Sequence, residues 1–194
     1  MNFAEFQRYA PLSATQVAQL RAHYELLVRW NAKLNLTRIE SPESAELLHY
    51  CESLYLGQAL PAGPVKIVDI GTGAGFPGIP IAILRPESHV TLVESHQRKA
   101  VFLREATREL PNIKVYSGRA QDLPGSFDWV VSRAVTPSEV LELPNSKQFA
   151  VLVGPEDAAK LGGFVLPWGE GRNLASVPRG TLSPLTLNVP RGTL

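Results

Sequence analysis

A group of glycines behind an acidic residue is the part of this sequence best suited to holding a small ligand. The stretch IVDIGTGAGFPGIP, residues 67–80, begins with β-branched residues and then turns through Gly71, Gly73, Gly75 and Gly78. Glycine lacks the Cβ that would block close approach, so backbone N–H groups in such turns can face a ligand. The pattern predicts a nucleotide-type cofactor site at the carboxyl end of a strand.

Two descriptions fit these glycines and lead to different cofactors. Residues 73–78, GAGFPG, satisfy the GxGxxG pattern, which predicts a nicotinamide dinucleotide and an oxidoreductase. The form D-x-G-x-G-x-G that begins at Asp69 fits better, because Phe76 and Pro77 add bulk where a diphosphate would need room. That form resembles the cofactor loop of the class I S-adenosylmethionine-dependent methyltransferases, whose ligand carries a sulfonium instead of a phosphate. We therefore expect Asp69, the loop glycines and Phe76 to bind the cofactor.

Two later strand ends supply further candidates for the same site. Glu94 ends the second predicted strand, where its carboxylate can accept hydrogen bonds from both ribose hydroxyls or lie solvated at the surface. The loop GRAQDLP, residues 118–124, follows the third strand, where this fold usually supplies adenine contacts. Ala120 and Gln121 are the expected residues there, with an ordinary surface loop as the alternative.

Arg133 ends the fourth predicted strand, at the position that faces the reacting centre of such a fold, and is the expected catalytic residue. It can hold the cofactor carboxylate, hold a substrate phosphate, or pair with an internal acid such as Asp122 or Asp128. No (D/N)PP(Y/F/W) motif for amino methylation follows this strand. The single cysteine, Cys51, lies in a predicted N-terminal helix, which disfavours methylation at a pyrimidine C5. Guanine N7 already exposes a lone pair, so the sequence is compatible with its methylation.

The elements that must position these residues alternate between strands and helices. Strands are predicted at 65–70, 89–94, 112–118, 127–135 and 148–153, with helices through 81–84 and at 98–110. This alternation predicts an α/β fold with a doubly wound, mostly parallel sheet. Residues 162–168 and 172–177 can pair as an antiparallel edge.

Three regions are expected along the chain: an N-terminal helical extension at 1–60, a methyltransferase domain at 61–176 and a mobile tail at 177–194. In the extension, the capping box of Ser13 and Gln16 predicts a helix over about 14–34, and Ser41-Pro42 starts another. Residues 57–64, GQALPAGP, have the composition of a linker. The tail repeats VPRGTL at 177–182 and 189–194.

The overall composition excludes several classes of protein. A hydrophobic fraction of 44% over 194 residues excludes global disorder, and no apolar run is long enough to cross a bilayer. No secretory signal begins the chain, and neither the lone cysteine nor the four histidines have metal-ligand spacing, so we expect no metal. The expected protein is a cytoplasmic monomer without a membrane partner.

The formal net charge of +1 gives no general support to nucleic-acid binding but leaves local basic faces open. Two basic sets can meet RNA phosphates or be solvated helix faces. They are Arg21, Arg29, Lys33 and Arg38 in the extension, and His96, Arg98, Lys99, Arg104 and Arg108 farther along the chain.

Six motifs occur in an order that resembles the glucose-inhibited division protein B family, the bacterial 16S ribosomal RNA guanine-N7 methyltransferases. They are WNAKLNLT (30–37), HxxESL (49–54), DIGTGAGFPGIP (69–80), RKxxFL (98–103), GRA (118–120) and SRAV (132–135). The resemblance covers about residues 20–175. It implies S-adenosylmethionine as cofactor and 16S rRNA or the small ribosomal subunit as substrate. It also implies cofactor contacts at Gly71, Phe76, Ala120, Gln121 and Arg133, with Glu94.

The chain departs from that family at three places. Val153 stands where the family commonly has a lysine, Gln121 replaces an acidic residue, and the Pro-Arg-Gly repeat interrupts the strand after Arg172-Asn173-Leu174. Two alternatives remain open, the second of them because of Val153 and the altered tail. One is an NAD-dependent oxidoreductase that uses the GxGxxG pattern, and the other is a non-catalytic RNA-binding or assembly protein on the same fold.

Overall fold

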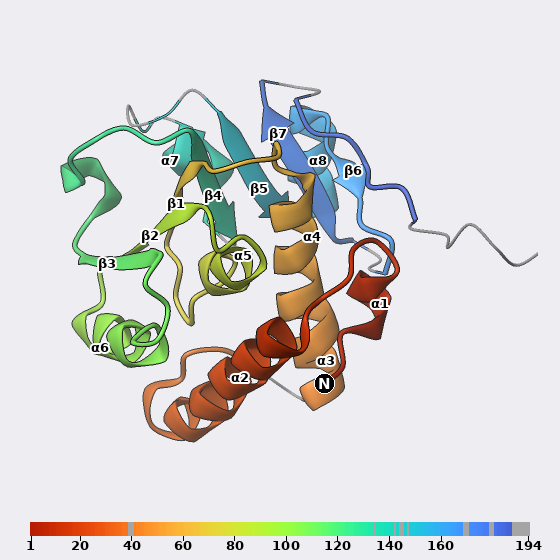
Figure 1. Ribbon diagram of the computed structural model, residues 1–194. Coiled ribbons are helices and arrows are strands. Elements are labelled where there is room, and N and C mark those ends of the chain that lie inside the picture. Colours follow the sequence, from red (N-terminus) through yellow and green to blue (C-terminus); the bar gives the residue numbers. More distant parts are fainter. Residues whose placement is uncertain are drawn as a thin grey trace, which may run out of the picture.

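A seven-stranded sheet forms the centre of the part of the chain that the structure describes (Figure 1). The structure is a computed structural model, which describes residues 1–38, 41–133, 135–141, 143, 146, 148–168, 171–178 and 181–187. The strands are β1 (Lys66–Ile70), β2 (His89–Glu94), β3 (Ile113–Ser117), β4 (Trp129–Arg133), β5 (Phe149–Val153), β6 (Phe164–Val165) and β7 (Asn173–Val177). Their order is β3-β2-β1-β4-β5-β7-β6. The first five strands are parallel, whereas β7 runs antiparallel to β5 and to β6. The predicted doubly wound sheet and its antiparallel edge are confirmed.

The central strand β1 is buried on both faces from Ile67 to Ile70, and Asp69 is the one polar residue among these four. Ile67 belongs to the core on one face of the sheet, and Val68 and Ile70 belong to the core on the other. In the parallel register, Ile70 lies beside Val93 of β2 and Ser132 of β4. The carboxyl ends of these three strands therefore meet at one edge, where the strand order reverses, and such an edge is the usual ligand site of an open α/β sheet.

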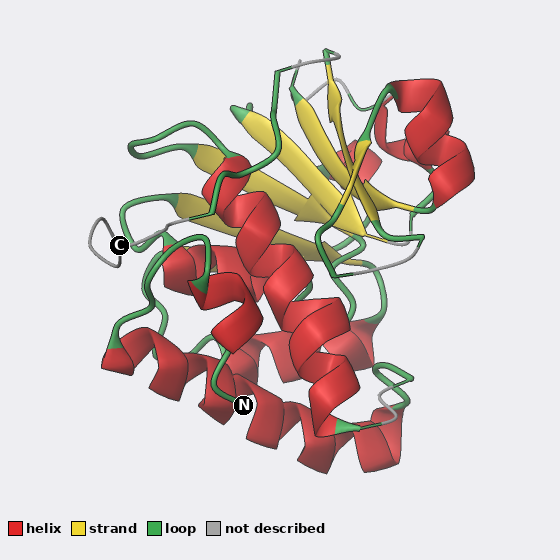
Figure 2. Ribbon diagram, turned by 90° about the vertical axis from the view of Figure 1, so that its right-hand side faces the viewer, coloured by secondary structure: helices red, strands yellow, loops and turns green. Residues whose placement is uncertain are grey.

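Helices cover both faces of the sheet (Figure 2). One face carries α1 (Ala4–Gln7), α2 (Ala14–Leu34), α3 (Pro42–Ala45), the π-helical turn η1 (Glu46–Cys51), α4 (Glu52–Ala59), α5 (Gly78–Leu84) and α6 (Gln97–Ala106). The opposite face carries α7 (Pro137–Leu141) and α8 (Pro155–Leu161). A short 3₁₀ turn, η2 (Ala120–Asp122), follows β3. None of the described helices is both long enough and apolar enough to cross a membrane.

The N-terminal helices begin where the sequence predicts. The Ser13 side chain accepts a hydrogen bond from the Gln16 N–H at 3.2 Å, and the Gln16 side chain accepts one from the Ser13 N–H at 2.9 Å. This capping box satisfies two backbone donors that would otherwise lack partners at the start of α2. Ser41 caps α3 in the same way, by accepting from the Ser44 N–H at 3.1 Å.

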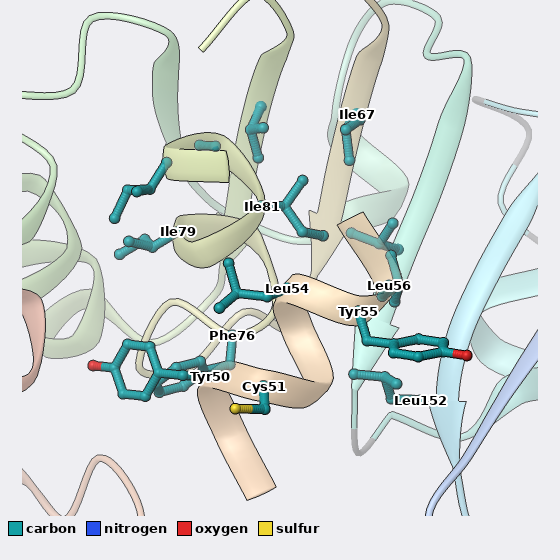
Figure 3. Close-up of a cluster of buried hydrophobic side chains, with 14 of the residues drawn as sticks. Tyr50, Cys51, Leu54, Tyr55, Leu56, Ile67, Phe76, Ile79, Ile81 and Leu152 are labelled. Atoms are coloured by element: carbon teal, nitrogen blue, oxygen red, sulfur yellow. The ribbon is translucent and has the colours of Figure 1, made fainter. Parts of the chain in front are cut away.

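Helix α4 ties the extension to the sheet. Its residues 52–57 are all buried, and they pack against α5 and β5 (Figure 3). Gly57 permits this close approach, because a Cβ there would lie 3.2 Å from Cγ1 of Ile81 in α5. The predicted linker at 57–64 is therefore wrong at its start, since α4 continues to Ala59. One buried cluster includes residues from both sides of the expected boundary at residue 60.

Part of the tail expected to be mobile contacts the body of the protein. Leu182 is buried and its N–H donates to Oγ of Ser176 at 3.2 Å. The Leu185 N–H donates to the Tyr55 hydroxyl at 2.7 Å. The second copy of VPRGTL, residues 189–194, lies outside the described residues.

Candidate functional site

Two adjoining cavities open at the carboxyl edge of the sheet. The first, of about 420 Å³, lies at the ends of β1, β2 and β3, and we call it the β1–β3 cavity. The second, of about 360 Å³, lies at the ends of β4, β5 and β7, and we call it the β4–β5 cavity. Val135, just after β4, lines both of them, so the two cavities share a wall.

Four of the predicted cofactor residues meet in the β1–β3 cavity: Gly71, Glu94, Ala120 and Gln121. They come from three separate strand ends, so their convergence depends on the parallel register. Arg133 lines the β4–β5 cavity instead. The sequence therefore predicted one group of residues that the structure divides between two neighbouring cavities.

The glycine loop requires glycine for two reasons. Gly71, Gly73 and Gly75 have φ values of +67°, +58° and +93°, which other residues rarely adopt. A Cβ on Gly71 would also lie 2.6 Å from Cγ2 of Val135, in the wall between the cavities. The N–H groups of Gly71 and Thr72 both donate to the Val93 carbonyl, at 3.1 and 3.2 Å, which ties the loop to β2.

Asp69 lies beneath this loop and is fully buried. Its Oδ2 accepts hydrogen bonds from the Thr72 hydroxyl at 2.5 Å and from the Gly78 N–H at 2.8 Å, so it holds the loop and the start of α5 together. Burial is the main cause that raises the pKa of Asp69 to about 7, against the effect of these two hydrogen bonds. Its Oδ1 is buried without a hydrogen-bond partner. Asp69 is not among the residues that line either cavity.

Glu94 is fixed in the cavity wall rather than solvated. Only 8% of the residue is exposed. Its Oε2 accepts from the Gly73 N–H at 3.1 Å, and its Oε1 accepts from the His96 N–H at 2.8 Å. A carboxylate keeps further lone pairs after accepting two hydrogen bonds, so Glu94 can still accept from ribose hydroxyls.

The ring of Phe76 faces the helical extension and lines neither cavity (Figure 3). Its centroid lies 4.9 Å from that of Tyr50, nearly perpendicular to it, 5.2 Å from His49 and 5.4 Å from His23. The expected contact of Phe76 with the cofactor therefore does not involve the ring as it lies here. Any contact of Phe76 with a cofactor has to come from its backbone.

His23 links helix α2 to the glycine loop, a connection that sequence reasoning missed. With the Tyr50 hydroxyl donating to Nδ1 at 2.7 Å, Nε2–H donates to the Ala74 carbonyl at 3.1 Å. Burial lowers the pKa of His23 to about 4, so the ring stays neutral at neutral pH. The sequence did contain one signal for the burial of His23. The residue follows Leu20 by three positions and precedes Leu27 by four, which is the spacing of one face of a helix.

We expect His23 to make the protein less stable in acid. Its pKa is about 4 in the folded protein against 6.5 ordinarily, so protonation favours the unfolded chain below pH 6.5. This contribution to stability is lost as the pH falls from 6.5 towards 4, and amounts to about 2 kcal/mol between pH 7 and pH 5. Between pH 7 and pH 5, the free energy of unfolding measured in urea should therefore fall by about 2 kcal/mol less in His23→Gln than in the unmodified protein.

Tyr50→Phe is the matched control for this measurement, because it removes the hydrogen bond to Nδ1 but keeps the imidazole. It should retain most of the acid dependence of the unmodified protein. Equal loss of stability between pH 7 and pH 5 in His23→Gln and in the unmodified protein would show that His23 does not carry the effect.

Arg133 belongs to a partly buried cluster with Glu52 and Arg172. Glu52 of α4 is 1% exposed, and its carboxylate accepts from Nε and Nη2 of Arg172 at 2.6 and 3.2 Å. Nε of Arg133 lies 3.9 Å from Oε2 of Glu52. The expected internal partners, Asp122 or Asp128, were wrong: the acid beside Arg133 is Glu52, which the sequence offered only as part of the HxxESL motif.

Burial sets the ionisation of this cluster. It lowers the pKa of Arg133 to about 10, an effect that the Glu52 charge opposes and the Arg172 charge reinforces. Burial also raises the pKa of Glu52, and the hydrogen bonds from Arg172 and the charge of Arg133 counteract this rise. His49 nearby has its pKa lowered to about 4 by burial and by the Arg133 charge. The two guanidinium groups and the Glu52 carboxyl group thus lie together near His49, whose ring is neutral at neutral pH.

Most residues of the two predicted basic sets lie on α2 and α6, which pack together, whereas Arg38, His96 and Arg108 lie outside these helices. A hollow of about 470 Å³ between these helices is lined by Arg29, Trp30, Lys33 and Glu105, among others. Arg98 and Arg104 are exposed on α6. Helices α2 and α6 lie side by side (Figure 1), and α6 begins three residues after Glu94, which lines the β1–β3 cavity.

Comparison with known proteins supports the resemblance. A family model described as "rRNA small subunit methyltransferase G" matches residues 16–148. A ribosomal RNA small subunit methyltransferase G of Lactococcus lactis is 34% identical, and the match covers 89% of this chain and 87% of the relative. The protein of the same name from Nitrosomonas europaea is 48% identical over 63% of this chain and 58% of its own length. The chain thus spans less than two thirds of that relative.

Solved structures with low sequence identity share the fold. A SAM dependent methyltransferase from Aquifex aeolicus has a TM-score of 0.52 at 16% identity, covering 74% of this chain and 97% of its own. A putative RNA methyltransferase from Pyrococcus horikoshii has a TM-score of 0.51 at 14% identity, covering 86% and 100%. The expected class of fold, that of the class I methyltransferases, is confirmed.

Proposed function

Since the chain belongs to the rRNA small subunit methyltransferase G family, we propose that it transfers a methyl group from S-adenosylmethionine to N7 of a guanine in 16S ribosomal RNA. The observation that supports this most directly is the convergence of Gly71, Glu94, Ala120 and Gln121 on one cavity at the carboxyl edge of the sheet. The substrate is naked 16S rRNA or the small ribosomal subunit. We place the reaction in the cytoplasm and the enzyme as a monomer.

The residues of the β1–β3 cavity fit the proposed cofactor. Gly71 leaves open the space that a Cβ would fill between the two cavities, and Glu94 presents an acceptor fixed by two backbone N–H groups. Ala120 and Gln121 line the cavity from the β3 end, where they would contact the adenine. When bound, S-adenosylmethionine supplies a methyl group activated by a positive sulfonium.

The acceptor needs no general base from this chain. The lone pair of guanine N7 forms the new bond to carbon while the carbon–sulfur bond breaks and its electrons remain on sulfur, so no proton moves from N7. The task of the protein is then to align the acceptor and to exclude water. The β4–β5 cavity, which shares Val135 with the cofactor cavity, is the space from which an acceptor base would approach.

The position of Asp69 disfavours the alternative nicotinamide dinucleotide. In dinucleotide-binding folds, the pyrophosphate binds the free N–H groups at the start of the helix after the loop. Here Oδ2 of Asp69 accepts from the Gly78 N–H at the start of α5. The buried acid thus occupies a donor that a pyrophosphate would need.

Methyl transfer from labelled S-adenosylmethionine tests the proposed function. Small ribosomal subunits and naked 16S rRNA that lack the modification should each be offered to the protein, and the modified nucleotide should be mapped by mass spectrometry. Label in 7-methylguanine of one substrate is the expected result. Binding of S-adenosylhomocysteine without any transfer would favour the non-catalytic assembly protein, and binding of NAD alone would favour the oxidoreductase.

A further inference from the structure

The cluster of Glu52, Arg133 and Arg172 has unequal pairing. Arg172 donates two hydrogen bonds to Glu52, at 2.6 and 3.2 Å, whereas the Nε of Arg133 is 3.9 Å from the same carboxylate. A charge-assisted hydrogen bond has a length of about 2.7–2.9 Å, so Arg133 has a looser ion pair and Arg172 a tight one.

The charges of the three side chains in the cluster do not balance one another. Two guanidinium groups carry +2 and one carboxylate carries −1. Arg133 is only 15% exposed in its side chain, so water screens its charge poorly. Both arginines line the β4–β5 cavity, and Val135, two residues after Arg133, separates this cavity from the β1–β3 cavity.

We propose that Arg172 is a positioning residue: it holds the Glu52 carboxylate away from Arg133, so that Arg133 remains available for the carboxylate of the cofactor's amino-acid end. This inference rests on the proposed function for the identity of the cofactor. Without Arg172, Glu52 would have Arg133 as its remaining partner in the cluster and would compete with the ligand for the same guanidinium group. Arg172 thus affects Arg133 indirectly, through Glu52, which is 120 positions away from Arg172 in the sequence.

Two ligands that differ in the amino-acid end isolate this contact. S-adenosylhomocysteine carries the carboxylate, whereas 5′-methylthioadenosine lacks it and keeps the adenosine. Titration calorimetry should give both dissociation constants for the unmodified protein, Arg172→Gln, Glu52→Gln and the double variant. The ratio of the two constants reports the contact with the amino-acid end and cancels changes in the adenosine part of the site.

We expect Arg172→Gln to weaken S-adenosylhomocysteine binding about tenfold, with less than about a twofold change for methylthioadenosine. In the double variant Glu52→Gln/Arg172→Gln, both the competing carboxylate and its partner are gone, and affinity for S-adenosylhomocysteine should return to within about threefold of the original. Arg172→Gln leaves Glu52 paired with Arg133, so the variant should remain folded, which circular dichroism will check.

Three outcomes would overturn the inference. Equal weakening of both ligands in Arg172→Gln would mark a general structural role. Weakening that Glu52→Gln does not reverse would mark direct contact of Arg172 with the ligand. Unchanged binding in every variant would mean that Arg133 meets another anion, such as an RNA phosphate. Binding of S-adenosylhomocysteine to the unmodified protein is measured first, before any variant. Failure to bind at that stage would contradict the proposed function instead of this inference.

Discussion

Gly71→Val should weaken the binding of S-adenosylhomocysteine at least about 100-fold, while the sheet remains folded. Valine is β-branched and is strained at a φ of +67°. Its Cβ would also lie 2.6 Å from Cγ2 of Val135, so the loop or the cavity wall has to move. Gly71 follows Ile70, the last paired residue of β1, and its own hydrogen bond to Val93 is at the very end of the strand, which is why the damage should stay local. Calorimetric titration measures the affinity, and circular dichroism measures the fold.

Gly63→Val is the matched control. Gly63 has a similarly positive φ of +89°, but a Cβ there would meet nothing within 4 Å, and the residue precedes β1 at the other end of the strand. It should lose some stability and keep its affinity for the ligand. If Gly71→Val bound as tightly as Gly63→Val, the glycine loop would have to be removed from the proposed site.

Arg133→Ala should lower kcat/KM for methyl transfer at least about 100-fold, because removing a buried, charged contact with a ligand costs about 2–5 kcal/mol. Glu52 keeps its two hydrogen bonds from Arg172 in this variant, so no buried carboxylate is left without a partner. The measurement is the initial rate of label transfer to the RNA substrate at several concentrations of cofactor.

Arg8→Ala is the control for Arg133→Ala. Arg8 also has a carboxylate partner, Glu5, but the side chains of both are about half exposed and lie on the N-terminal segment. The rate should be unchanged in this variant. An Arg133→Ala protein that transferred methyl groups at the original rate would leave Arg133 with a structural role only.

The sequence predicted the sheet well because the signals for its strands are local. Strands β1 and β5 each contain a short run rich in apolar and β-branched residues, and a glycine directly follows each of them. Helices α7 and α8 were not predicted, since each is short and has a single buried residue. The start of the predicted linker failed because Gly57 was read as a turn residue, whereas it packs against Ile81.

The candidate site could be predicted only in part from the sequence. Gly71 and Glu94 follow from their positions at strand ends, which the order of the strands brings together. The contacts of Glu52 with Arg172 and of His23 with Ala74 join residues 120 and 51 positions apart, and a single sequence contains no signal for such pairs. The position of the Phe76 ring could not be predicted for the same reason, because its neighbours lie on helices distant in the sequence.

The hydrogen bond from His23 to the Ala74 carbonyl couples the first long helix to the segment that would hold the methyl donor. By linkage, a ligand that immobilises this segment also makes opening of α2 more costly, and deuterium uptake around His23 would slow when the donor is bound. Helix α2 and the donor site would thus act as one cooperative unit. Binding of the methyl donor would then change the stability of a helix that carries Arg29 and Lys33, two of the residues that could contact RNA.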